Sequence, residues 1–349
     1  MTSTCRKDGL RLAFIKQPWT PIWTRESTRF TAPDAMLDAH FYKSCNLSLL
    51  LHFGGDAWVV GDEAPCPTHS RAMWEEADTE ALAEVYEQTA TTKLDDIPWG
   101  EYDIVLAQDL VIPKRIIEAN PCTLWCRWEA IHASSTFGKD LHGYDLFWDF
   151  TLESPRELTR LPQMLSLPFM VNADILRGMV RPTHEDAVFV PSRAVRPHGD
   201  VYPLLFGKAT VAGLPMRHDR IWNLRRTWRA ILDGRVETTR EHFANVGSCK
   251  YLLNIRDADI GQPIIEAAAL GLIVVSAPEK YAVVCHPYCR VADLAEGIHT
   301  ISRLQQAPSV QQEILQYQDT VLEELFWNRP LSLLGEALEM KREQCAQKC

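Results

Sequence analysis

In the stretch DIGQPIIEAAALGLIVVS, residues 259–276, a run of mostly apolar side chains after the Gly-Gln-Pro turn contains one carboxylate, Glu266. The stretch predicts a helix that begins near Gly261, because Pro263 is tolerated in a first turn and Gly271 suits the end of a helix. N–H groups at a helix start can bind a phosphate, and a glycine there lets the ligand come close to the backbone. The carboxylate of Glu266 could then accept hydrogen bonds from a vicinal diol such as a ribose. The alternative is a carboxylate that only complements the helix dipole.

The elements around this stretch alternate between strand and helix along the whole chain. In the first half we expect strands within 11–16, 48–61, 102–108, 122–128 and 144–150, with helices near 48–53, 78–93 and 113–118. In the second half we expect strands at 187–191, 209–215, 251–255, 272–276 and 281–285, with helices near 219–233, 238–246 and 291–304. Such alternation predicts parallel sheets covered on both faces, which is an α/β fold with two doubly wound domains.

The domain boundary is expected in an irregular, proline-containing stretch at 153–186. We place a first domain at 1–175, a second at 176–308 and a pair of terminal helices at 309–349, which could cross back to the first domain. Ser309 and Gln312 have the spacing of a capping box, and Pro330 is expected to end the first of these helices. Its apolar stripe comprises Val310, Ile314, Tyr317, Val321 and Leu325.

The composition excludes several classes of protein. A net charge of −10 argues against sequence-independent binding of nucleic acid, and no apolar run is long enough for an integral membrane segment. The N-terminus has no signal core, and the ten cysteines are dispersed. We therefore expect reduced thiols in a cytoplasmic protein. The sequence CHPYC at 285–289 is either half of a zinc site or, as ordinary cysteine usage favours, a pair of buried thiols.

The order strand, loop, G-x-P-x-x-E-A-x-A-x-G and strand resembles the nucleotide-sugar site of GT-B glycosyltransferases. The resemblance implies that Gly261, together with Gln262 and Pro263, meets the donor diphosphate, while Glu266 holds the ribose. It also implies two Rossmann-like domains that face each other across a cleft, with an N-terminal acceptor domain and a C-terminal donor domain. Many retaining members carry a further glutamate where this chain has Ala258, so retention or inversion of configuration stays open.

Cationic side chains are needed to neutralise a departing diphosphate. Arg193, Lys208 and Arg217 are the candidates in this chain. Because helix N–H groups and cations can meet this need together, we expect no metal and no cofactor other than the nucleotide-diphosphate sugar itself.

A general base that activates an acceptor hydroxyl is expected on the first domain. Asp109 follows the strand at 102–108, and Glu129 and His132 follow the strand at 122–128. The ordinary pKa of histidine suits this role, although a cap or a loop hydrogen bond is the alternative for all three.

These observations favour a metal-independent glycosyltransferase that moves a sugar from a nucleotide-diphosphate sugar to an acceptor hydroxyl. The acceptor, whether a glycan, a lipid-linked molecule or a small molecule, is not specified by the sequence. The alternatives are a sugar-nucleotide epimerase of the same shape and a non-catalytic nucleotide-sugar-binding protein. A nicotinamide dehydrogenase is disfavoured because KQPWTPIW, and not G-x-G-x-x-G, follows the first strand.

Overall fold

The computed structural model describes residues 9–16, 29–30, 36–37, 44–60, 92–108, 110–128, 143–148, 156–157, 165–191, 210–218, 238–255, 262–277 and 281–348. The chain divides into two compact units, each built around its own sheet. The first unit takes its described residues from 9–169 and from 329–348, and the second takes them from 170–328. Along the described residues, no helix has both the length and the apolar character needed to cross a bilayer.

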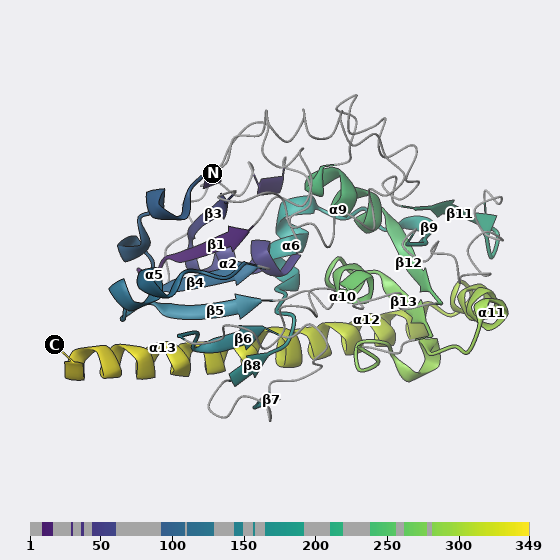
Figure 1. Ribbon diagram of the computed structural model, residues 1–349. Coiled ribbons are helices and arrows are strands. Elements are labelled where there is room, and N and C mark those ends of the chain that lie inside the picture. Colours follow the sequence, from purple (N-terminus) through teal and green to yellow (C-terminus); the bar gives the residue numbers. More distant parts are fainter. Residues whose placement is uncertain are drawn as a thin grey trace. The chain divides into compact units, whose positions relative to one another are not determined.

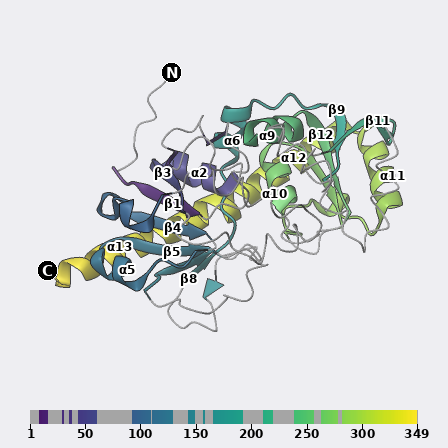
Figure 2. The same cartoon turned by 45° about the horizontal axis from the view of Figure 1, so that its top comes forward.

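The first unit contains an eight-stranded sheet in the order β2-β3-β1-β4-β5-β6-β8-β7. The strands from β3 to β8 in this order are parallel, and the edge strands β2 and β7 are antiparallel to their neighbours. Their bounds are β1 Leu12–Lys16, β2 Arg29–Phe30, β3 Gly55–Val59, β4 Ile104–Gln108, β5 Leu124–Trp128, β6 Leu146–Trp148, β7 Arg156–Glu157 and β8 Leu165–Leu167. Strands β1, β4 and β5 run side by side (Figures 1 and 2) and are buried along their whole length, as parallel strands covered on both faces must be.

A helix and a strand of this unit are joined by two glycines, as the sequence predicts. Helix α2, Ser44–Phe53, ends before Gly54, and β3 starts at Gly55. Gly55 has a φ of 139°, and a Cβ atom there would lie 1.8 Å from the carbonyl oxygen of Leu12. Only glycine therefore allows β3 to pair this closely with the start of β1.

Helices lie on both faces of the first sheet. Helix α5, Lys114–Ala119, contributes Ile116 and Ile117 to a buried cluster with Ala13 and Val105. The connection from β1 through α2 to β3 leads to one side of β1, and the connection from β4 through α5 to β5 leads to the other side. Because such crossovers are right-handed, α2 and α5 cover opposite faces. The unit is therefore doubly wound, and its strand order reverses between β1 and β4.

The C-terminal helix α13, Arg329–Lys348, belongs to the first unit. Cys345 forms a disulfide with Cys122, which lies just before β5, and their Cα atoms are 5.3 Å apart. Lys341 of the same helix forms an ion pair of 2.8 Å with Asp145. The expectation of reduced thiols is thus wrong for this cysteine pair, which chain folding brings together across 223 residues. Disulfides are rare in reducing compartments, and the cytoplasmic location stays a prediction.

The second unit contains a five-stranded sheet in the order β10-β11-β9-β12-β13. Strands β11, β9, β12 and β13 are parallel, and β10 pairs antiparallel with β11. The bounds are β9 Glu185–Phe189, β10 Thr210–Val211, β11 Leu214–Arg217, β12 Cys249–Asn254 and β13 Ile273–Ser276. The single strand expected at 209–215 is wrong: Ala212 and Gly213 have φ values of 52° and 78° and turn the chain into a hairpin.

Within the described part of the second unit, four α-helices precede the terminal helices. They are α6 Ala173–Val180, α9 Thr239–Gly247, α10 Gln262–Ala269 and α11 Leu294–Leu304. Thr238 accepts a hydrogen bond from the N–H of Glu241, whose side chain accepts one from the N–H of Thr238, so a capping box starts α9. The strand expected at 281–285 is wrong, because these residues form turns with Tyr281 at a φ of 55°.

Helix α12, Pro308–Glu323, differs from its expected form in three ways. Ala307 is the N-cap and makes no side-chain hydrogen bond, so the capping box expected at Ser309 and Gln312 is absent. Its buried residues are Gln311, Ile314, Gln318 and Leu322, of which the expected stripe contained only Ile314. Pro330 does not end the helical run, because a π-helical turn at Glu324–Asn328 leads into α13, where Pro330 is the second residue. Proline is tolerated in a first turn, where N–H groups have no helical partner.

Candidate functional site

The second sheet reverses its strand order between β9 and β12. From β9 the chain passes to β11 on one side, and from β12 it passes through α10 to β13 on the other side. In open α/β sheets ligands bind beyond the carboxyl ends of the strands at such a reversal. Helix α10 directly follows the loop that leaves the carboxyl end of β12, so its first turn belongs to this edge of the sheet.

Glu266 lies in the second turn of α10, and only 6% of its surface is exposed. The residues on either side of it, Ile265 and Ala267, have no exposed surface. A buried carboxylate costs free energy unless it is paired with a cation, a hydrogen-bond donor or a ligand. Glu266 is therefore not the solvated helix-start carboxylate that the sequence left open, and its position is consistent with a binding role.

The other end of α10 is held by a cation. Arg177 of α6 donates a hydrogen bond of 3.2 Å to the carbonyl oxygen of Ala268 and forms an ion pair of 2.6 Å with Asp319 of α12. A positive charge at this end complements the helix dipole. The chain then leaves through Gly271, whose φ of 86° suits glycine and completes the predicted turn into β13.

The carboxyl ends of β12 and β13 are tied to each other by polar groups. Asn254 and Ser276 are the last residues of the two strands and are opposite each other in the register. The hydroxyl of Ser276 donates to the carbonyl oxygen of Asn254 at 2.6 Å, and the N–H of Ala277 donates to the same oxygen at 3.1 Å. These hydrogen bonds hold the carboxyl ends of β12 and β13 together.

Arg217 is held by groups near the opposite edge of the sheet. Its guanidinium forms an ion pair of 2.5 Å with Glu185, at the start of β9, and donates a bond of 2.6 Å to the hydroxyl of Ser248, just before β12. These contacts favour a structural role for Arg217, and its role on a diphosphate stays a prediction.

Several predicted site residues lie outside the described residues. They are Gly261, Arg193 and Lys208 on the donor side, and Asp109, Glu129 and His132 among the candidate bases. Gln262 and Pro263 form the first turn of α10. For Gln262 the structure describes only the backbone. The strands that precede the candidate bases, β4 and β5, pair along their whole length and end side by side at Gln108 and Trp128.

The cysteines of CHPYC are buried and do not look like metal ligands. Burial raises the pKa of Cys285 to about 12, and it raises that of Cys289 well above its ordinary value. Cys285 donates to the carbonyl oxygen of Val274 at 3.5 Å. Within the described part of the chain, no group of three or more His, Cys, Asp and Glu residues could hold a metal ion. The interpretation as buried thiols therefore describes this segment.

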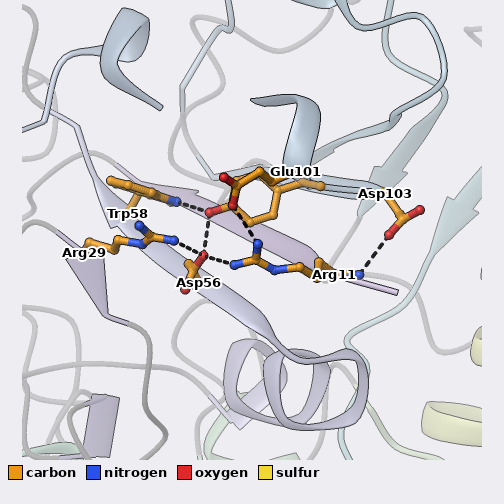
Figure 3. A network of polar contacts seen from close by, with 7 residues as sticks. Arg11, Arg29, Asp56, Trp58, Glu101 and Asp103 are labelled. Atoms are coloured by element: carbon orange, nitrogen blue, oxygen red, sulfur yellow. Dashed lines mark hydrogen bonds and ion pairs between the residues drawn. The ribbon is translucent and has the colours of Figure 1, made fainter. Parts of the chain in front are cut away.

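A second buried polar network lies in the first unit (Figure 3). Asp56, only 2% exposed, accepts hydrogen bonds from Arg11 at 2.8 Å, from Arg29 at 2.9 Å and from the hydroxyl of Tyr102 at 2.5 Å. The indole of Trp58 donates to the same hydroxyl at 3.0 Å. The network lies near the amino ends of β1, β3 and β4, away from the edge where α/β sheets bind ligands. We assign it a structural role.

Sequence reasoning missed two polar residues at the carboxyl edge of the first sheet. Lys16 and Gln108 end β1 and β4, and their exposed fractions are 2% and 0%. The signal that would have found them is a polar residue at the last position of an otherwise apolar strand.

Known proteins were compared with the chain by sequence and by structure. No model of a protein family matches the sequence, and no curated protein matches it. A structure of accessory secretory proteins 1, 2 and 3 of Streptococcus pneumoniae has 12% identity and a TM-score of 0.46, covering 76% of this chain and 57% of that chain. AviGT4, a glycosyltransferase involved in avilamycin A biosynthesis, has 13% identity and a TM-score of 0.46, covering 97% of this chain and 98% of its own.

A variant of the wall teichoic acid polymerase TagF has 9% identity and a TM-score of 0.42, covering 99% of this chain and 92% of its own. The strand order of the two mostly parallel sheets, one in each compact unit, shows that the chain is an α/β protein with two Rossmann-like units.

Proposed function

We propose that the protein is a glycosyltransferase that moves a sugar from a nucleotide-diphosphate sugar to an acceptor hydroxyl. The observation that carries the proposal is the burial of Glu266 in the second turn of α10, the helix that follows β12 at the strand-order reversal of the second sheet. The first turn of this helix supplies N–H groups and the positive end of a dipole for the diphosphate. Glu266 accepts hydrogen bonds from the ribose hydroxyls.

Two candidate bases fit the first unit by their place in the chain. Asp109 follows Gln108 at the end of β4, and Glu129 follows Trp128 at the end of β5. Because β4 and β5 are parallel neighbours, the two strands end at the same edge of the sheet, at Gln108 and Trp128. In the proposed reaction one of Asp109, Glu129 and His132 takes the proton of the acceptor hydroxyl, while donor-side N–H groups stabilise the departing diphosphate.

The donor site is tested by nucleotide binding. A thermal-shift screen with UDP, GDP, CMP, ADP and dTDP identifies the base, since a ligand at 100 times its Kd raises stability by about 2.7 kcal/mol. Calorimetry with the best nucleotide then compares the wild type with Glu266→Ala and Glu266→Gln. We expect Glu266→Ala to weaken binding by about 1–3 kcal/mol, the scale of hydrogen bonds to a charged group. Glu313→Ala, which removes an exposed carboxylate from α12, is the matched control and is expected to bind as the wild type does. Unchanged affinity in folded Glu266→Ala would contradict the ribose assignment.

The reaction class is tested with the matching sugar nucleotides. Transfer to a supplied acceptor, with slow donor hydrolysis in its absence, is the expected result. Interconversion of donor isomers would identify an epimerase instead. Donor binding without turnover across a broad acceptor panel would identify a binding protein.

Metal independence is tested by chelation. The loop between β12 and α10 contains Asp257-Ala258-Asp259, a spacing that can hold a divalent cation together with a diphosphate. We expect transfer to continue in EDTA, because helix N–H groups and cationic side chains neutralise the leaving group. Complete loss in EDTA that Mg²⁺ or Mn²⁺ restores would contradict this part of the proposal.

A further inference from the structure

Two buried polar residues occupy neighbouring positions at the carboxyl edge of the first sheet. Lys16 and Gln108 are the last residues of β1 and β4, and the strand register places them directly opposite each other. Their exposed fractions are 2% and 0%, although lysine and glutamine are usually exposed. Residues opposite each other in adjacent strands lie on the same face of the sheet, so the side chains of Lys16 and Gln108 are on one face.

The pair stands where the strand order of the first sheet reverses. The chain leaves β1 toward β3 on one side and leaves β4 toward β5 on the other side. In open α/β sheets, ligands bind beyond the carboxyl ends of the strands at such a reversal. Val59, at the end of β3 in the same register row, is apolar, so the polar residues that this row places at the reversal are Lys16 and Gln108.

The side chains of Lys16 and Gln108 suit an anionic ligand that also carries hydroxyl groups. A lysine ammonium supplies three donors and a positive charge, and a glutamine amide both donates and accepts. Two strands beyond Gln108, at a spacing of about 10 Å, Trp148 ends β6 in the same register row. Its indole nitrogen is buried and has no hydrogen-bond partner among the described residues. A buried donor of this kind is costly unless a ligand or water accepts from it.

We propose that the carboxyl ends of β1 and β4 bind the anionic group of a small ligand, a phosphate or a carboxylate. Lys16 pairs with the anion, Gln108 binds the adjoining hydroxyl groups, and the indole N–H of Trp148 donates to the far end of the ligand. Binding of the anion depends on the first sheet alone. The role of this ligand as the acceptor rests on the proposed glycosyl transfer.

The test uses calorimetry on the full-length protein with four probes: inorganic phosphate, glucose 6-phosphate, glucuronate and uncharged glucose. We expect the wild type to bind glucose 6-phosphate or glucuronate at least tenfold more tightly than glucose, and the stronger of the two identifies the anion. Lys16→Met, which keeps the length of the side chain and removes the charge, is expected to abolish this tenfold preference. Gln108→Leu is expected to weaken the sugar probes while inorganic phosphate binds as before.

The matched control is Lys114→Met, which removes a lysine of α5 whose side chain is 73% exposed. It is expected to keep the wild-type preference for the anionic probe. Equal affinity of the wild type for glucose and its anionic forms would overturn the proposal, as would an unchanged preference in folded Lys16→Met. If Lys16→Met does not fold, wild-type crystals soaked with glucose 6-phosphate decide: the phosphate is expected at the ends of β1 and β4, and its absence there overturns the proposal. Glu266→Ala should leave all four probes unaffected, so failure of the donor assignment and failure of this site remain distinguishable.

Discussion

Gln318 of α12 takes the place of a neighbouring strand for Val274 of β13. Its side-chain oxygen accepts a hydrogen bond of 3.1 Å from the N–H of Val274, and its side-chain nitrogen donates one of 2.8 Å to the carbonyl oxygen of Leu272. Gln318 has no exposed surface. Because β13 is the last strand of its sheet, this one side chain satisfies two backbone groups that would otherwise be buried without partners.

Replacing Gln318 by leucine is therefore expected to destabilise the protein strongly. Two buried backbone groups lose their partners, and each costs about 1–3 kcal/mol, so the free energy of unfolding should fall by about 2–6 kcal/mol. Urea unfolding measures the change. Gln312→Leu, at an exposed position of the same helix, is the control and should stay close to the wild type. Similar losses in the two variants would show that the edge contact is not the cause.

Asp56→Asn is expected to disrupt the network of Figure 3. The substitution removes the buried negative charge that the partly exposed Arg11 and Arg29 share, so we expect a loss of about 1.5–3 kcal/mol, the scale of hydrogen bonds to a charged group. The control variant is Asp95→Asn. Asp95 forms an ion pair with Arg115, and the two side chains are 63% and 65% exposed. Exposed pairs contribute little, so this variant should unfold almost as the wild type does. A ranking in the reverse order would contradict the structural role of the network.

The hydroxyl of Tyr102 should make the protein less stable in alkali. Burial raises the pKa of Tyr102 to about 12, and its hydrogen bond to Asp56 adds to the shift. Between the ordinary value of 10 and about 12, the tyrosine is ionised only in the unfolded chain, so unfolding becomes easier as the pH rises through this range. Below pH 10 this contribution is fully present.

Tyr102→Phe cannot ionise and should lose less stability than the wild type between pH 10 and pH 12. Unfolding in urea at a series of pH values measures both slopes. Tyr251, whose pKa burial also raises to about 12, remains in the variant and keeps part of the slope. Parallel curves for the wild type and Tyr102→Phe would refute the assignment.

The Cys122–Cys345 disulfide is expected to stabilise the first unit. Cys345→Ser should lower its free energy of unfolding by about 2–4 kcal/mol, because the unfolded chain gains freedom when a long loop is opened. Dithiothreitol should bring the wild type to the same value and leave the variant unchanged. Peptide mapping without reduction should recover the linked pair, and recovery of both residues as free thiols in the untreated protein would contradict the prediction.

Buried parallel strands were the most predictable part of the fold. The apolar runs at 102–108, 122–128 and 251–255 become β4, β5 and β12, because a strand covered on both faces must be apolar along its length. The same rule misled at 281–285, where Val284 and Cys285 are fully buried in turns. An apolar run indicates burial, and only hydrogen-bonded pairing makes it a strand.

The candidate site was predictable only where one local pattern carries it. The position of Glu266 on α10 follows from the spacing of proline, glutamate and glycine along one helix. Lys16 and Gln108 stand 92 positions apart in the sequence, and only the register of β1 with β4 brings them together. Likewise, the contacts of Arg217 with Glu185 and Ser248 depend on strand order, which no local pattern contains.

Helix α13 is the part of the first unit that is synthesised last. A ribosome releases the chain from the N-terminus, so the eight strands of the first sheet emerge before the segment from Arg329 that completes their unit. Until then Cys122 cannot form its disulfide with Cys345, and the surface that buries Leu334 and Leu338 is incomplete. The second unit, whose described residues all lie between Met170 and Asn328, can therefore fold before the first unit is complete.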